Sequence, residues 1–592
     1  MIANIAWNKK LAEQYIAEIK SFGEEFLAVD IETSGLRFHP DTEICGISVS
    51  FKRTNIQNSA YYFPIKHKSE DYKRNLKKDT ISKLMNFLCN EAKHLVFHNA
   101  KFDVKLIQRD YGEIKGVIHD SMIYASIQGF RKLKLSELIT TLFPDMYHEK
   151  LALQNTVDEY RKYLKVDDFS EIPISLLGMY CCQDSSNTLD VYTKLYENFK
   201  EKNYGKDKED LYQLELNLLK ALIAVETFGA AIDVEYLIEQ KNQLQAITDS
   251  LRVELEVELG VKNVNSTIQI SEALREGLNI ALTKLTKSGK NFSTDNRTLE
   301  KIKHPAVQKL LEYRKKYKLL STYVMGLLNN EFDGRTHTGY TQIFTKTGRL
   351  SSREPNLQNI PKKDTDIIRR AFIAPEGKAL VYYDESQIEL RLLAHFSKDK
   401  RMLDILNSGG DLHQATADTL GISRDEGKTI NFGIIYGLQE NHLANDLKIS
   451  ETKAGRYIKD YFVHYSGVRK YKTRLESYAL SSGYVTTWLG RRVYMGEKDS
   501  YAALNYVIQG SAADLLKIVH VRCYNYISDN KLETKTVLSI HDEFVNETPE
   551  NELEHIIEFK KLAEDFNNFD VPIICDVAIT WTNWAENEEL EI

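Results

Sequence analysis

Four acidic residues and one tyrosine in the first two hundred residues have the types and spacing of a hydrolytic metal site. Asp30 and Glu32 lie two apart in "AVDIET", and a strand would place both carboxylates on one face. Asp103 follows in "FHNAKFDVKL", and Tyr180 and Asp184 lie four apart in "YCCQDSS", on one helix face. Carboxylates this close repel one another unless a cation lies between them. The set predicts phosphodiester hydrolysis by two metal ions, with Tyr180 orienting the water. Unrelated surface acids are the alternative.

A second pair of carboxylates lies in the second half of the chain. Asp384 ends the apolar strand "ALVYYDES" just before a helix, and Asp542 lies at the tip of the hairpin "VLSIHDEFVNE". Two such strands side by side would bring both carboxylates to one edge of a sheet, where metal ions would hold them. Glu543 is then expected to be a neighbour rather than a shared ligand. Taken alone, adjacent acids in a turn are more typical of a solvated tip.

The segment "RDEGKTINFGIIYG" places Arg424, Lys428, Phe432 and Tyr436 at every fourth position, followed by Gly437. On a helix, such a stripe drifts by only about 40° per step, so one face presents two cations and then two aromatic rings. Cations suit a triphosphate, and rings suit a base and its sugar. An amphipathic helix with aromatic residues in a core is the alternative, but it does not account for the cations in the same stripe.

A polar, basic stretch precedes these motifs. "YTQIFTKTGRLSSREPNLQNIP" cannot form one continuous helix, because it contains Gly348 and Pro355. Its short hydrogen-bonding groups are typical of contacts with a sugar-phosphate backbone or a minor groove, although an ordinary polar loop would look similar. Residues 312–372 hold 12 Lys/Arg and 6 Asp/Glu, whereas residues 546–592 hold 2 and 13. A basic stripe can bind phosphates although the whole chain has a net charge of −7; a solvated helix face is equally compatible.

Length and composition limit the class of protein. A chain of 592 residues with 42% hydrophobic and 28% charged residues predicts a globular protein of several domains. Its six cysteines include only one close pair, Cys181 and Cys182, which suits neither a zinc site nor a disulfide framework and favours a reducing compartment. The N-terminus lacks the apolar core of a signal peptide, and no stretch is apolar enough to span a membrane. We therefore expect a cytoplasmic protein without a membrane partner.

The pattern of elements changes three times along the chain. Strands such as "FLAVDIET" and "HLVFHN" alternate with helical stretches over the first 200 residues or so, which predicts an α/β domain. A charge-dense segment suggests a boundary near Asn203. Long helical patterns follow, one of which ends at Gly229. A strand and a helix then begin at Leu380, before a mainly helical stretch over 413–480.

The first set of acids resembles the tyrosine-containing DEDD-type 3′–5′ exonucleases over roughly residues 20 to 200. The chain as a whole resembles the family A DNA polymerases. "YYDESQIELR", the fingers stripe, "IHDEF", "TGRLSSREPNLQNIP", "LNYVIQGSAADLLK" and the thumb segments "VETFGAAID" and "STYV" all match family motifs. The resemblance implies an α/β and α+β multidomain fold, with a ribonuclease H-like exonuclease domain followed by a right-hand polymerase. The expected domains are the exonuclease at 1–205, the thumb at 206–335, the palm at 336–405 and 495–592, and the fingers at 406–494.

The resemblance also assigns roles to individual residues. Arg424 and Lys428 would bind the triphosphate, and Lys428 would protonate the pyrophosphate. Glu389 would exclude a ribose 2′-OH. The other residues expected around the nucleotide are Phe432, Tyr436, Gln387 and His413. The residues expected to contact DNA are Arg349, Asn356, Gln358, Asn359, Asn505, Gln509 and His541.

The resemblance implies template-directed, two-metal addition of deoxynucleotides with proofreading. The expected cofactors are two Mg²⁺ ions per active site, for which Mn²⁺ could substitute, held by oxygen ligands. The expected partners are primer-template DNA and dNTPs, together with a helicase, a primase or a single-strand-binding protein at a replication fork. The protein itself is expected to be a monomer.

Several departures from the family pattern qualify this interpretation. With Asp30 so near the N-terminus, we expect no 5′-nuclease domain before the exonuclease. The thumb shows no long insertion of the kind that recruits a processivity factor, and the stretch between "GRRVYMGEKD" and Asn505 is short. The compact length and Lys/Asn/Ile-rich character are compatible with a phage replication enzyme.

Two rival interpretations remain. A single-subunit RNA polymerase shares the palm motifs, but Glu389 and a proofreading domain argue against it. A repair nuclease whose second half only binds DNA would not need intact Asp384, Asp542, Arg424 and Lys428.

Overall fold

The computed structural model describes residues 1–23, 25–35, 38–54, 57–164, 168–201, 206–286, 288–360 and 366–592. The domain boundary predicted near Asn203 lies outside the described residues. So do residues 361–365, which belong to the basic stretch 312–372.

The N-terminal part of the chain forms a six-stranded mixed sheet covered by helices. The central strand β2 (Phe26–Thr33) pairs antiparallel with β3 (Ile44–Thr54) and parallel with β5 (His94–Phe97). The order is β1-β4-β3-β2-β5-β6, completed by β1 (Ile2–Ile5), β4 (Gln57–Pro64) and β6 (Val117–Asp120). The long helix α8 (Ile174–Glu201) packs across β1 to β4. Helices cover the sheet, so β2 and β3 are buried over most of their length, and the predicted α/β domain is confirmed.

A second, five-stranded sheet lies in the C-terminal part. The order is β15-β16-β12-β17-β18, from β15 (Lys535–Ile540), β16 (Glu543–Pro549), β12 (Lys378–Glu385), β17 (Cys575–Thr580) and β18 (Glu588–Glu589). Val381 and Tyr383 of β12 pack into one core with α16 (Ile388–Ser397), α23 (Ala503–Asp529) and α24 (Ile556–Glu564). Leu380 and Tyr382 face a second core on the opposite side. The period-two pattern of β12 therefore separates two cores.

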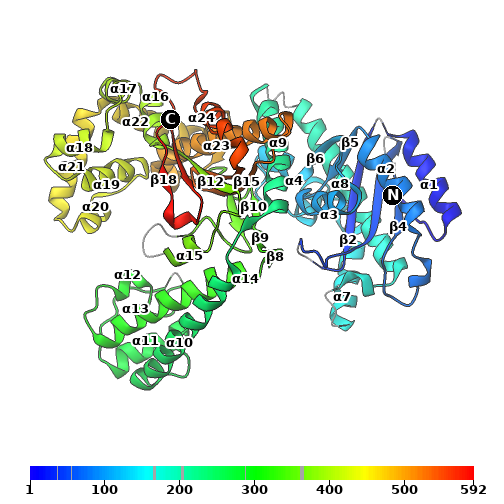
Figure 1. The fold of residues 1–592 in the computed structure, drawn as a ribbon, viewed down its shortest axis with the longest axis horizontal. Coiled ribbons are helices and arrows are strands. Elements are labelled where there is room, and N and C mark those ends of the chain that lie inside the picture. Colours follow the sequence, from blue (N-terminus) through cyan, green and yellow to red (C-terminus); the bar gives the residue numbers. More distant parts are fainter. Residues whose placement is uncertain are drawn as a thin grey trace.

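Two helical arms extend from this sheet on the side away from the N-terminal domain (Figure 1). In one arm, α10 (Val234–Leu259) packs against α13 (Pro305–Lys318) around a core of its own. The other arm contains α18 (Leu412–Leu420), α19 (Arg424–Ile435), α20 (Glu440–Leu447), α21 (Glu451–His464) and α22 (Ser466–Ser482).

Helix α9 (Lys206–Phe228) lies between the two sheet domains (Figure 1). It packs against α3 (Lys101–Tyr111) and α4 (Ser121–Ile127) of the N-terminal domain, and against α23 and β15 of the C-terminal one. This helix belongs to the segment 206–335 that the sequence predicts to be a thumb. In the structure it contacts both sheet domains.

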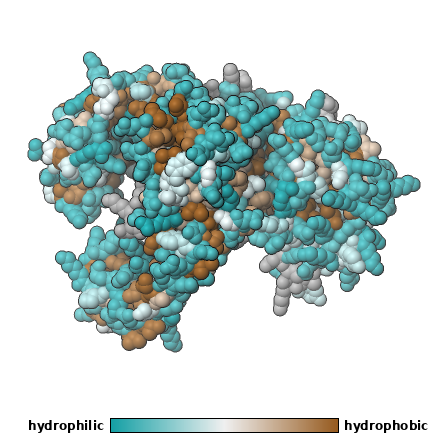
Figure 2. All heavy atoms as spheres, in the orientation of Figure 1, coloured by the Kyte–Doolittle hydropathy of each residue, from teal (hydrophilic) through white to brown (hydrophobic). Residues whose placement is uncertain are grey.

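In the described part of the chain, no helix is both long and apolar enough to cross a bilayer. Figure 2 shows mostly hydrophilic residues on the visible face. All six cysteines are buried and free in the structure.

Candidate active sites

The N-terminal sheet and its helices bring together the first set of acids. Asp30 and Glu32 lie on one face of β2, as their spacing predicts. Asp103 lies in the first turn of α3, and its Oδ1 accepts a hydrogen bond from the Ile31 backbone N–H at 3.3 Å. Asp184 is on α8, close enough to act electrostatically on both acids of β2. One strand and two helices therefore assemble a cluster of four carboxylates.

The electrostatics of this cluster favour a bound cation. Burial raises the pKa of Asp30 and of Glu32 well above the usual range, and the neighbouring carboxylates raise both further. Burial also raises the pKa of Asp103 and of Asp184 to about 7. Charging all four acids is therefore unfavourable without compensating positive charge. A divalent ion with oxygen ligands would supply that charge.

Cys181 is a member of this site that the sequence analysis did not identify. Its Sγ lies 3.2 Å from Asp30 Oδ2 and 3.3 Å from Ser48 Oγ, and it belongs with Asp30 and Glu32 to a group able to hold a metal ion. Burial raises the pKa of the thiol, so Cys181 acts as a hydrogen-bond donor to Asp30. A helical spacing of three residues from Asp184 was the available signal.

Tyr180 points its hydroxyl toward another helix. The hydroxyl donates a hydrogen bond to Gln154 Oε1 on α7 (Ala152–Leu164) at 3.2 Å. Burial raises the pKa of Tyr180, and Asp184 and Glu32 raise it further, so the tyrosine lies beside the acid cluster in its neutral form. Its predicted role in orienting water stays a prediction.

The second pair of acids meets at one edge of the five-stranded sheet. Strand β12 lies directly beside β16, with Asp384 opposite Glu543 in the register. Asp542 occupies the turn between β15 and β16, and its backbone O accepts a hydrogen bond from Glu385 N–H at 3.2 Å. The two strands therefore lie side by side as the sequence pattern requires, with Asp384 and Asp542 at the same edge.

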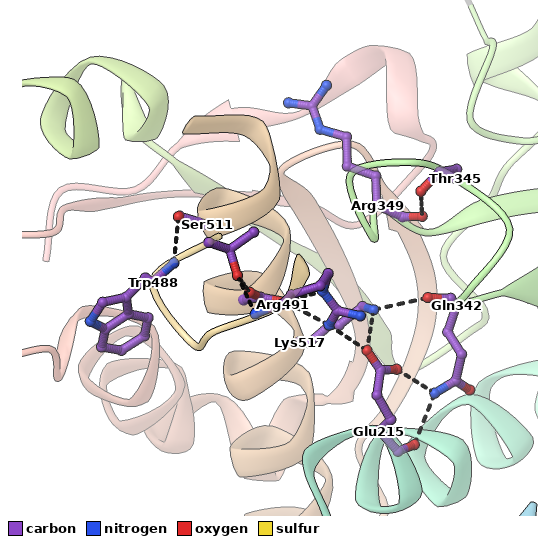
Figure 3. A network of polar contacts seen from close by, with 10 residues as sticks. Glu215, Gln342, Thr345, Arg349, Trp488, Arg491, Ser511 and Lys517 are labelled. Carbon is purple, nitrogen blue, oxygen red and sulfur yellow. Dashed lines mark hydrogen bonds and ion pairs between the residues drawn. The ribbon is translucent and has the colours of Figure 1, made fainter. Parts of the chain in front are cut away.

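Arg349 is the cation beside this pair. Its Nη2 lies 2.5 Å from Glu389 Oε1 and 3.8 Å from Asp542 Oδ1. The backbone O of Arg349 accepts a hydrogen bond from Thr345 Oγ1 at 2.7 Å, which holds the loop that carries it (Figure 3). Burial raises the pKa of Glu389, and the guanidinium of Arg349 opposes that shift. The residue predicted to contact DNA thus also bridges two predicted active-site acids.

The predicted stripe lies on α19. Ser423 and Glu426 form a capping box at its N-terminus, directly before Arg424. The Phe432 ring lies 5.6 Å from the His413 ring and 6.0 Å from the Tyr436 ring, between centroids. Tyr436 caps the C-terminus of the helix, and Gly437 follows with a φ of 71°.

The ion pair of Arg424 and the pKa values of His413 and Tyr436 describe the electrostatics of this arm. Arg424 Nε is 2.6 Å from Asp411 Oδ2, in an ion pair across the two helices α18 and α19. Burial lowers the pKa of His413 to about 4, and Arg424 and Lys428 oppose its protonation further. His413 is therefore neutral at physiological pH. Burial raises the pKa of Tyr436 to about 12, with Glu389 as a second cause.

The remaining predicted contacts fall into two groups. Gln358 shapes the hairpin turn: its Oε1 accepts from His541 N–H at 2.7 Å and its Nε2 donates to Ser539 O at 2.8 Å. Asn359 contributes its backbone O to the Tyr323 hydroxyl at 2.6 Å. By contrast, Gln387 Oε1 and Asn505 Oδ1 are buried without a hydrogen-bond partner in the part of the chain that the structure describes.

Two further positions lie near these groups. Asn356 Oδ1 is 3.5 Å from Ser352 Oγ within the same polar loop. Gln509 lies one turn beyond Asn505 on α23, on the same face of the helix. The unpartnered amide oxygens of Gln387 and Asn505 are available to a ligand.

The fold and the two acid clusters define a class of protein. An α/β domain with a buried cluster of acids that could bind metal ions is joined to a second domain, which has an antiparallel sheet with two acids at its edge and two helical arms. Sequence models identify the two parts. Residues 234–586 match the model described as DNA polymerase family A, and residues 4–200 match the one described as 3′-5′ exonuclease. The chain belongs to DNA polymerase family A.

Relatives and a solved structure agree with this membership. DNA polymerase I of Borreliella burgdorferi is 31% identical over 95% of this chain and 62% of the relative, and that of Pseudomonas aeruginosa is 30% identical over 98% and 64%. The chain thus spans less than two thirds of the length of these relatives. A structure described as the POL domain of Pol1 from M. smegmatis, in complex with DNA primer-template and dNTP, matches with a TM-score of 0.80 and 26% identity, covering 98% of this chain and 99% of that one.

Proposed function

We propose that this chain is a template-directed DNA polymerase that adds deoxynucleotides to a primer 3′ end, and that its N-terminal domain removes nucleotides from that end. The observation that carries the proposal is the presence of two separate carboxylate sites on two sheets, within a chain of this family. One site suits nucleotidyl transfer and the other suits hydrolysis, since both reactions need clustered acids that bind metal ions.

The donor atoms of both sites fit divalent cations with a preference for oxygen. Asp384 and Asp542 would hold them at the polymerase site, where Mg²⁺ is the expected ion and Mn²⁺ a substitute. At the exonuclease site the ligands would be Asp30, Glu32, Asp103 and Asp184. Bound metal ions would activate the attacking oxygen and neutralise charge on the phosphate in each reaction.

The chain's own side chains bind and orient the nucleotide. Arg424 and Lys428 would contact the triphosphate, and Arg424 would have to exchange its ion pair with Asp411 for the phosphates. Lys428 would then donate a proton to the departing pyrophosphate. The rings of Phe432 and Tyr436, with His413 behind Phe432, would form an apolar surface for the base and sugar.

One acid and two amides add to the proposed nucleotide and primer-template contacts. Glu389 is buried beside Tyr436 and Arg349, where a carboxylate would clash with a ribose 2′-OH. Gln387 and Asn505 offer unpartnered amide oxygens to the nucleotide and to DNA. The other proposed DNA contacts are Arg349, Asn356, Gln358, Asn359, Gln509 and His541.

The partners and the location are proposals of the same kind. The solved neighbour holds primer-template DNA and dNTP, which supports the same ligands for this chain. We propose a monomer in a reducing cytoplasm, since all six cysteines are free, acting at a replication fork with a helicase, primase or single-strand-binding protein. The relatives named above are bacterial, and a phage origin stays a prediction.

Primer extension on a defined template tests the proposal directly. We expect deoxynucleotide addition with Mg²⁺ or Mn²⁺, none with EDTA, and trimming of the primer when dNTPs are omitted. Preferential ribonucleotide addition would instead support an RNA polymerase. Trimming without any extension, in a protein that binds primer-template DNA, would support a nuclease with a DNA-binding module.

A further inference from the structure

Helix α9 carries one buried carboxylate toward each of the two sheet domains. Glu226 is bound by two lysines of the N-terminal domain: Lys101 Nζ lies 2.6 Å from its Oε1 and Lys105 Nζ lies 2.7 Å from its Oε2. All three side chains are at least 87% buried, with exposed fractions of 2%, 13% and 10%. Both lysines are on α3, on either side of Asp103, which belongs to the exonuclease site.

Glu215 occupies the equivalent place toward the polymerase domain. Its Oε1 accepts from Lys517 Nζ of α23 at 2.6 Å and from Arg491 Nη2 at 2.5 Å, and Arg491 also pairs with Asp514 at 2.6 Å (Figure 3). Glu215, Asp514 and Lys517 are almost entirely buried. The two acids are eleven residues apart, or about three helical turns, so they lie on one face of α9 about 16 Å apart.

Both acids also hold the same short piece of the polar loop. Glu226 Oε1 accepts from Tyr340 N–H at 2.8 Å, and Glu215 Oε2 accepts from Gln342 Nε2 at 2.6 Å. Lys101 donates to the backbone O of Tyr340, and Lys517 donates to that of Gln342 at 3.0 Å. The loop continues from Gln342 to Arg349, at the polymerase site.

A second chain of hydrogen bonds continues from Tyr340 to the catalytic hairpin. The Tyr340 hydroxyl accepts from Ser539 N–H on β15 at 2.9 Å. Ser539 O accepts from Gln358, and Gln358 in turn accepts from His541 N–H, directly before Asp542. Buried and partly buried polar contacts therefore run without interruption from the helix of Asp103 to the turn of Asp542.

We propose that α9 is a rigid connection that fixes the distance and orientation between the two active sites. Its contact with the exonuclease domain, the joint formed by Glu226, Lys101 and Lys105, has Glu226 as its positioning residue. The inference rests on the proposed function. Because the joint keeps the two sites at a fixed distance, a primer end can move from one site to the other while the DNA stays bound. Neither Glu226 nor Glu215 contacts reacting atoms.

The joint is sensitive to the loss of its single acid. Glu226→Gln keeps the size of the side chain but leaves Lys101 and Lys105 buried without a carboxylate, which is unfavourable. We expect the N-terminal domain to lose its fixed position in this variant, while each acid cluster remains intact within its own domain.

The test measures transfer of a mismatched primer end within one binding event. Enzyme is bound to a mismatched primer-template, and Mg²⁺ is added together with a heparin trap. We expect the fraction of primers excised before dissociation to fall at least threefold in Glu226→Gln. Hydrolysis of a single-stranded oligonucleotide and extension of a matched primer should stay within twofold of wild type. An unchanged excised fraction in the folded variant would overturn the proposal.

Two further variants make the result specific. Lys105→Met leaves Lys101 paired with Glu226, so we expect a smaller fall in the same direction, and this variant decides the question if Glu226→Gln does not fold. Lys83→Met is the matched control, because Lys83 pairs with Glu13 at the same 2.7 Å but at an exposed site of the same domain. An equal fall in Lys83→Met would contradict the role of the buried joint.

Calorimetry separates this proposal from the proposed function. We expect wild type to unfold in one transition and Glu226→Gln to unfold in two, because the domains lose their coupling. A wild-type protein that neither extends nor trims primers would refute the function, while the calorimetric result would still judge the joint. A single transition in both proteins would refute the joint.

Discussion

The two acid clusters differ in what compensates their charge. In the exonuclease domain, burial raises the pKa of all four carboxylates, and repulsion by the other acids of the cluster raises the pKa of Asp30 and Glu32 further. Cys181, in close contact with Asp30, is a neutral thiol. In the polymerase domain, the guanidinium of Arg349 lies beside Asp542 and Glu389. Within the first cluster, Arg161 lowers the pKa of Glu32 only as the smallest of its causes, so protons or metal ions must compensate most of the charge, whereas the guanidinium of Arg349 lies directly beside the second cluster. The two sites should therefore respond differently to mutation, pH and metal ions.

The largest expected effect comes from removing the proposed metal ligands at one cluster only. Asp542→Asn or Asp384→Asn should reduce primer extension by about a thousandfold or more, equal to roughly 4 kcal/mol of lost transition-state stabilisation, and leave trimming intact. Asp30→Ala combined with Glu32→Ala should do the reverse. The measurement is extension and trimming of the same labelled primer. Loss of both activities in a folded, DNA-bound palm variant would show that the two sites are not independent.

Substitution of Glu389, the ion-pair partner of Arg349, tests whether this acid selects the sugar of the nucleotide. Glu389→Ala should raise the ratio of ribonucleotide to deoxynucleotide incorporation by about tenfold or more, equal to roughly 1.4 kcal/mol, because it removes the carboxylate near the sugar. Single-nucleotide incorporation at one template position measures the ratio. Glu389→Gln serves as the control, since it keeps the volume and loses the ion pair with Arg349. Unchanged sugar selection in both variants would remove Glu389 from the nucleotide site.

A substitution of Phe432 tests the proposed nucleotide side of the polymerase site, through the choice between deoxynucleotides and dideoxynucleotides. Its ring lies between His413 and Tyr436 and has no hydroxyl, so it cannot replace the hydrogen bond of a missing 3′-OH. Wild type should discriminate against dideoxynucleotides, and Phe432→Tyr should reduce this discrimination by roughly tenfold. The assay compares dideoxy and deoxy incorporation in an Asp30→Ala, Glu32→Ala background, where trimming is absent. Equal acceptance of both nucleotides by wild type would place Phe432 away from the sugar.

The smallest expected effect is a pH dependence of stability that arises in the exonuclease cluster. Asp103 and Asp184 have a pKa of about 7 when folded, above the usual value of 3.8, so the folded protein retains protons that the unfolded chain has lost. This contribution is fully present below about pH 4 and is lost as pH rises through about 7.

Thermal unfolding in EDTA measures this contribution. The Tm of wild type should fall by a few degrees between about pH 5 and about pH 8, and Mg²⁺ should cancel the fall because the cation replaces the protons. Asp184→Asn should show a shallower slope. A Tm in EDTA that does not depend on pH would mean that the acids of this cluster are compensated in another way.

Much of both sites could be predicted because their residues follow local periodicities. Asp30 and Glu32 share a face of β2 through the period of two, and Tyr180 and Asp184 share a face of α8 through the helical repeat. The sequence predicts that the strand ending at Asp384 lies beside the hairpin with Asp542 at its tip, and in the structure it is the second strand of that hairpin, β16, that pairs with β12. The family motifs added the order of the domains.

Other features could not be predicted because their partners are far apart in the sequence. Cys181 and its neighbour Cys182 suit neither a zinc site nor a disulfide framework, so the sequence assigns Cys181 no role, yet the crossing of α8 over β2 places its thiol against Asp30. The fourfold spacing predicts that Tyr436 lies within the helix, but α19 ends at Ile435 and Tyr436 caps it. Helix ends depend on capping and on the following glycine, which periodicity alone does not reveal.

The sequence by itself determined which side chains could do chemistry and on which face of each element they lie, because strand and helix geometry depend only on neighbouring residues. The tertiary structure alone decided that Arg349 reaches Glu389 and Asp542, and that Glu226 on α9 receives two lysines from the exonuclease domain. These contacts join residues forty to nearly two hundred positions apart. Only the packing of whole domains brings such charges within ion-pair distance, and burial strengthens the pairings of Glu226 further.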